Sequence, residues 1–142
     1  MKFLRIAPWL SIVLFGSVVS GCSEKLTVVL WNDGDLPVSV VIEGKELPIR
    51  PGQSGVFDYP SSVQNFTVRL RTSSCDILYL VPAGLPNYPH FPEYYGPVKV
   101  QFESDLSIYL APTDSKDIAP VSSLASWQKD GFPLHPIAKT CH

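Results

Sequence analysis

Apolar and polar residues alternate along the chain from residue 25 to residue 111, and this alternation limits the fold more than any other feature. Successive side chains of a strand point to opposite faces of a sheet, so each alternating run predicts a strand with one buried face and one exposed face. A helix would need a period of about 3.6 residues, which none of these runs shows. The clearest runs are 26–31, 38–43, 66–71, 98–103 and 106–110.

Turn-forming residues separate these runs where the chain has to reverse. The turn segments are Asn32-Asp33-Gly34-Asp35, Glu43-Gly44-Lys45, Pro51-Gly52 and Ser104-Asp105, and we interpret the first of them as a hairpin turn. We expect short strands at 25–31, 36–43, 45–50, 54–58, 64–71, 76–81, 98–103 and 105–111. Short strands separated by frequent turns are typical of a sandwich or barrel. We therefore predict an all-β fold, a small antiparallel β-sandwich of the immunoglobulin-like or transthyretin-like type.

The segment 82–97 departs from the alternation because it contains five prolines. Repeated proline excludes a central strand, so we expect a loop or an extended crossover there. The segment also carries a group of aromatic and histidine side chains: Tyr88, His90, Phe91, Tyr94 and Tyr95. Rigid aromatic side chains suit a binding loop. Alternatively, the same rings cover an open end of the sandwich and complete its core.

The N-terminal residues have the pattern of a signal peptide. Lys2 and Arg5 form a short basic region, an apolar stretch runs from Leu10 to Val19, and the small residues Ser20 and Gly21 follow. The apolar stretch is about half of the roughly twenty residues that a membrane-spanning helix needs. A retained transmembrane helix and an ordinary secretory peptide are the two alternatives.

The run Val19-Ser20-Gly21-Cys22 resembles the lipobox of bacterial lipoproteins. The resemblance implies cleavage after Gly21, a diacylglyceryl group on the sulfur of Cys22, and an acyl chain such as palmitate on its amine. In Gram-negative lipoproteins an aspartate after the cysteine marks retention in the inner membrane, so Ser23 implies the periplasmic face of the outer membrane. We therefore expect a cleaved signal peptide at 1–21, a β-sandwich domain at 22–111 and an irregular tail at 112–142 packed on the same domain.

Export would place the two remaining cysteines, Cys75 and Cys141, in an oxidising compartment. An even pair of cysteines there predicts a disulfide, which would tie the irregular tail to the sandwich. The alternative is a metal or catalytic thiol site, but neither cysteine belongs to a CxxC pair. Within the tail we expect one helical turn from Ser122 to Lys129, begun by the serine, with Trp127 available for packing.

Charge and motifs narrow the functional classes. Without Lys2 and Arg5 the chain keeps nine basic residues against thirteen acidic ones, a net charge of −4, which argues against a nucleic-acid partner. His90, His135 and His142 are too widely spaced for a metal motif, so we expect no metal, cofactor or catalytic residue. The sequence favours a membrane-anchored envelope lipoprotein that binds an envelope protein as an accessory module. The alternatives are a small periplasmic hydrolase built around His90, or a ligand or metal carrier.

Overall fold

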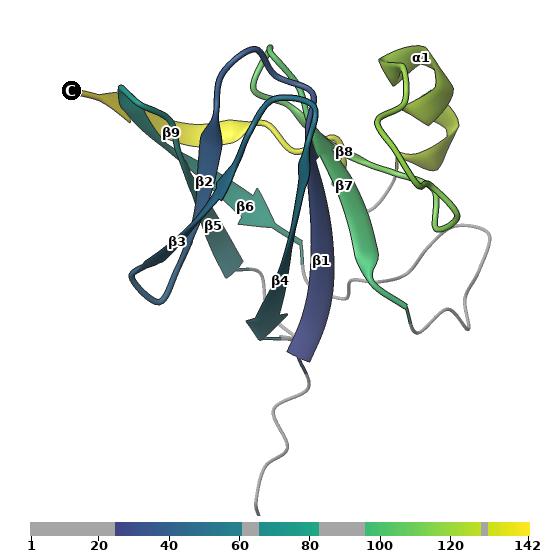
Figure 1. Cartoon of the computed structure of the whole chain (residues 1–142), viewed down its shortest axis with the longest axis horizontal. Helices are drawn as coiled ribbons and strands as arrows, with labels where there is room; N and C mark the ends of the chain where they lie inside the picture. Colours follow the sequence, from purple (N-terminus) through teal and green to yellow (C-terminus); the bar gives the residue numbers. More distant parts are fainter. Residues whose placement is uncertain (1–24, 61–65, 83–95, 129–130) are drawn as a thin grey trace, which may run out of the picture.

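The computed structural model describes residues 25–60, 66–82, 96–128 and 131–142, which form two β-sheets packed face to face (Figure 1). Within these ranges the first sheet has the order β4 (Ser54–Pro60), β1 (Lys25–Asn32), β7 (Val98–Phe102) and β8 (Ile108–Leu110). The second sheet has the order β3 (Lys45–Ile49), β2 (Val38–Ile42), β5 (Phe66–Arg71), β6 (Cys75–Val81) and β9 (Pro136–Cys141). The predicted all-β sandwich is confirmed, and each predicted strand is present with small shifts of its ends.

The pairing of β1 defines the type of sandwich. This strand runs antiparallel to β4 and parallel to β7, with Val28 opposite Val98, and every other named strand pair is antiparallel. The prediction of an antiparallel sandwich therefore needs one correction, at the β1–β7 pair. In the immunoglobulin order the first strand lies beside the second in one sheet, whereas β1 and β2 lie in different sheets here. This strand order differs from the immunoglobulin order, and the transthyretin-like alternative stays a prediction.

The core lies between the sheets and explains the alternation in the sequence. Leu30 and Val100 contribute from the first sheet, and Val40, Leu70 and Tyr79 contribute from the second. Each of these side chains is buried, while their neighbours along the strand point outward. Burial of apolar surface on the inward faces of the two sheets is the main contribution that holds them together.

The segment 32–35 is a crossing between sheets and not a hairpin turn, because β1 and β2 lie in different sheets. The fully buried side chain of Asn32 organises this crossing. Its Nδ2 donates to the carbonyl oxygens of Leu36 (2.9 Å) and Ile49 (3.0 Å), and its Oδ1 accepts from the backbone N–H of Gly34 (2.9 Å). By contrast, the turn at Glu43 and Gly44 does form a hairpin, between β2 and β3, with positive φ angles of 49° and 77°.

The first part of the tail covers the outer face of the first sheet. Trp31, Ala111 and Leu124 form a second buried cluster there, and the buried side chain of Gln101 bonds both the N–H and the C=O of Ala119. The expected helical turn is present as α1 (Val121–Leu124) and the 3-10 turn η1 (Ala125–Trp127). It begins after Pro120 without a side-chain cap, so the predicted role of the serine at its start is wrong.

The end of the tail forms β9, a strand that the sequence pattern did not predict. It pairs antiparallel with β6, and Cys75 lies opposite Cys141 in the register. The predicted Cys75–Cys141 disulfide is confirmed, and it joins this last strand to the sandwich. The tail is therefore irregular only up to β9, apart from the helical turn.

Candidate functional site

Most of the predicted site residues lie outside the described residues. These are the predicted lipidation site, Cys22, and the predicted binding loop, Tyr88, His90, Phe91, Tyr94 and Tyr95. Both assignments stay predictions. Among the residues that the structure describes, none of the helices has the length and apolar character needed to cross a membrane.

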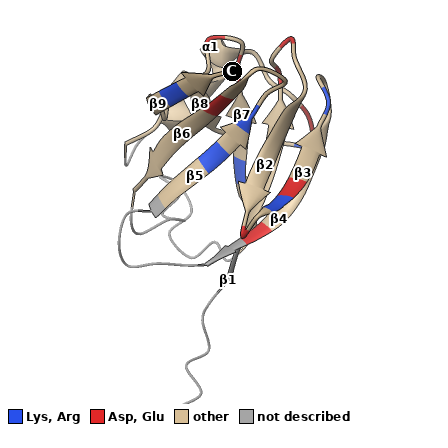
Figure 2. Cartoon of the chain, turned by 90° about the vertical axis from the view of Figure 1, so that its left-hand side faces the viewer, with Lys and Arg blue, Asp and Glu red and all other residues tan. Residues whose placement is uncertain are grey.

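The described strands show where the chain enters and leaves the sandwich. Lys25, the first residue of β1, pairs with Pro60 at the end of β4, and Val81 at the end of β6 pairs with Phe66. Strand β7 begins at Val98, beside the first half of β1. These strand ends gather at one end of the sandwich (Figures 1 and 2). The connection from β6 to β7, which contains the predicted binding loop, therefore departs from and returns to the end where β1 begins.

Charged residues lie along strands β3, β5 and β6 of the second sheet (Figure 2). Of these, Glu46, Arg71 and Asp76 are on its outer face, because they alternate with inward-facing residues such as the buried Leu70 and Ile77. The Nε of Arg71 donates to Asp76 Oδ1 at 2.7 Å, and its Nη1 pairs with Glu46 across β2. The hydrogen bond from Arg71 holds the pKa of Asp76 below its usual value, and the charge of Arg71 adds to this effect. Glu46 is exposed and Arg71 and Asp76 are half-buried at the surface, so solvent screens the ion pairs and they contribute little stability.

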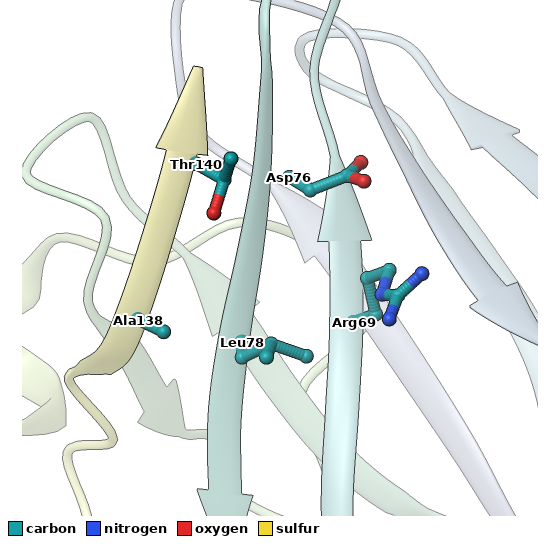
Figure 3. Close-up of a pocket in the computed structure, with 5 residues that line it drawn as sticks. All are labelled: Arg69, Asp76, Leu78, Ala138 and Thr140. Carbon is teal, nitrogen blue, oxygen red and sulfur yellow. The ribbon is translucent and has the colours of Figure 1, made fainter. Parts of the chain in front are cut away.

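A shallow depression of about 160 Å³ lies beside these ion pairs on the same face (Figure 3). Its lining comes from three neighbouring strands and consists of Arg69, Asp76, Leu78, Ala138 and Thr140. The depression exists because the two β9 residues are small: Ala138 lies opposite Leu78, and Thr140 opposite Asp76. An apolar floor with a charged rim can accept the side chain of a bound polypeptide. Sequence reasoning missed this surface because it did not predict β9.

A serine–histidine contact joins the turn between β7 and β8 to the residue just before β9. The Oγ of Ser107 is 3.1 Å from the Nδ1 of His135, but Ser107 is only 1% exposed. A buried hydroxyl is inaccessible to a substrate, so this contact fastens the β7–β8 turn to the segment before β9. Leu134 reinforces the connection, because its backbone pairs with Ile108 of β8.

A small acidic group surrounds Glu103, at the end of β7. Partial burial raises the pKa of Glu103, the carboxylate of Asp33 raises it further, and a hydrogen bond from Gln101 (2.6 Å) opposes the rise. The described part of the chain contains no group of three or more histidine, cysteine or acidic side chains that could hold a metal ion.

Comparison of the chain with protein-family models, with curated proteins and with solved structures found no match. The residues and their arrangement are therefore the basis for a functional proposal.

Proposed function

We propose that this protein is a cell-envelope lipoprotein, anchored through Cys22, whose β domain binds a protein partner close to the membrane. The observation that carries the proposal is the run Val19–Cys22 placed directly ahead of the first strand. Strand β1 begins at Lys25, so only Ser23 and Glu24 separate the anchor from the sandwich. Two extended residues span about 7 Å, which would hold the domain against the lipid headgroups.

This short tether gives the proposed domain an orientation. The end of the sandwich that contains Lys25 would face the bilayer, and the β6–β7 connection departs from Pro82 and returns at Gly96 at this same end. The described part of the domain at this end would then lie in the membrane-proximal layer. We propose that the partner is an envelope protein in that layer, on the periplasmic face of the outer membrane.

The depression on the second sheet suits a polypeptide better than a small molecule. Enzymes and carriers of small ligands use concave pockets that enclose most of the ligand. Here the depression on the second sheet is open and shallow, and its lining has an apolar floor and one cation and one carboxylate at the rim. Such a surface suits a polypeptide that lies along the sheet.

The anchor is tested with Cys22→Ala in the native host. We expect the variant to leave the membrane fraction and to lose the incorporation of an alkyne-labelled fatty acid. The control is the double variant Cys75→Ser with Cys141→Ser, which removes the other two cysteines and their disulfide but leaves Cys22 in place, and should keep both properties. If Cys22→Ala stays in the membrane fraction and still incorporates the fatty acid, the anchor is wrong.

Partner binding is tested by crosslinking in intact cells, with a photoreactive residue placed at exposed positions of the sandwich. We expect a discrete adduct with one envelope protein, reduced when Cys22→Ala releases the domain from the membrane. Equal adducts with the anchored and the released protein would contradict a partner in the membrane-proximal layer.

A further inference from the structure

Strand β9 forms the outer edge of the second sheet, and no other strand of the described ranges pairs with its second side. Five of its six residues are exposed, including Ile137 with 58% of its surface accessible. A free edge offers unpaired backbone groups to a further strand, and proteins use such edges to bind extended polypeptides.

The register shows which backbone groups of β9 are free. The N–H of His142 donates to the carbonyl of Ser74 at 2.8 Å, so Cys75 and Cys141 form a pair without direct backbone hydrogen bonds. In an antiparallel pair, pairs with and without direct backbone hydrogen bonds alternate. Lys139 is two residues before Cys141, so its pair with Ile77 also lacks direct backbone hydrogen bonds. The backbone N–H and C=O groups of Lys139 and Cys141 therefore point away from β6, towards solvent.

The disulfide fixes this edge in place. Cys141 is the last residue of β9, and its bond to Cys75 fastens the end of the strand to β6. At the other end, Leu134 pairs with Ile108 of β8. A strand held at both ends is already ordered, which lowers the entropic cost of binding a partner strand.

The side chains on the two faces of β9 differ, and they select the chemistry of the partner. Lys139 lies on the face opposite to Ala138 and Thr140, and residues 131–142 contain no acidic residue although the whole chain has a net charge of −2. An acidic side chain of an added strand would therefore be attracted on the Lys139 face. An apolar side chain on the other face would pass over Ala138 towards Leu78, the floor of the depression.

We propose that the free edge of β9 binds an extended segment of a partner protein in which acidic and apolar residues alternate. This inference rests on the proposed partner binding and identifies the kind of segment that is bound. A second copy of the chain fits less well, because pairing of two β9 strands about Lys139 would place two lysines opposite each other.

The experiment measures amide hydrogen exchange in the full-length protein, purified in detergent, with two synthetic peptides. In one peptide valine alternates with glutamate, and in the other valine alternates with lysine. We expect the glutamate peptide to slow exchange of the Lys139 and Cys141 amides by about tenfold and the lysine peptide to leave both unchanged. Equal effects of the two peptides, or no effect of either, would overturn the proposal.

Two substitutions at Lys139 separate the contribution of the backbone N–H to peptide binding from the contribution of the side-chain charge. Lys139→Pro removes an N–H that points away from β6, so the β6–β9 ladder should persist while peptide binding is lost. Lys139→Ala keeps the N–H, so the glutamate peptide should still bind but with less preference over the lysine peptide. The Lys139 and Cys141 amides could also exchange slowly in the absence of peptide. If this protection increased with protein concentration, a second copy of the chain would cover the edge, and the proposal would be overturned. Because the anchor test uses Cys22→Ala, failure here does not bear on lipidation.

Discussion

Removal of the Cys75–Cys141 disulfide should have a large effect on stability. The bond closes a loop with a sequence separation of 66 residues. In the chain-entropy model, freeing a loop of this length in the unfolded state lowers the free energy of unfolding by about 4 kcal/mol. Small domains have a total of about 5–15 kcal/mol. Replacing both cysteines with serine should therefore remove a large share of the stability.

The same substitution should act most strongly on β9. Because most of this strand is exposed, its apolar burial contributes little, and the disulfide supplies much of what holds it. The amides of Ala138 and Thr140 point towards β6, by the register. We expect these amides to exchange much faster in the double serine variant, while amides of the central strand β5 change less.

Urea unfolding followed by tryptophan fluorescence, to which the buried Trp31 contributes, measures the loss in the free energy of unfolding. Wild-type protein with its disulfide reduced serves as a control and should behave like the double serine variant. A loss below about 1 kcal/mol, together with unchanged protection of Thr140, would refute the view that the disulfide holds the last strand.

Three further substitutions test packing and charge. Tyr79→Phe should cost about 1–2 kcal/mol, since the fully buried Tyr79 hydroxyl donates to the Leu106 carbonyl at 2.8 Å; an unchanged urea midpoint would contradict this. Gly55→Ala should cost about 1–3 kcal/mol because its Cβ would lie 2.7 Å from Ile49 Cδ1, whereas Ser54→Ala, at an exposed neighbouring position, should be nearly neutral. Glu103→Gln should stabilise the protein at pH 7, because the folded state raises the pKa of Glu103 and so disfavours its charged form. That advantage should disappear as the pH falls below the ordinary carboxyl pKa, and a pH-independent difference in thermal midpoint would contradict the assignment.

The strands with one buried face could be predicted from the sequence because their burial alternates with the residue type. Strand β9 lacked that signal. It lies at a sheet edge with nearly every residue exposed, so Ile137 and Lys139 show no burial pattern for the sequence to reveal. The disulfide was predictable from the number of cysteines and the expected export, although its cross-strand geometry was not.

The sheet to which each strand belongs was not predictable from local turn chemistry. Asn32 and Gly34 indicate a turn, but the same residues serve a hairpin and a crossing between sheets. Whether the chain forms a hairpin or crosses to the other sheet depends on the long-range pairing of β1 with β4 and β7. The depression on the second sheet was hidden for the same reason, since it needs Ala138 and Thr140 beside Leu78. The predicted site residues Cys22 and Tyr88–Tyr95 lie outside the described residues and await experiment.

The proposed orientation of the domain depends on attachment of the chain to the membrane through Cys22, immediately ahead of the first strand. The most direct measurement is mass spectrometry of the N-terminal peptide from protein extracted with detergent from membranes. We expect a peptide that begins at Cys22, with a diacylglyceryl group on the sulfur and an acyl chain on the amine. A peptide that retains residues 1–21, or one that begins with an unmodified Cys22, would contradict it.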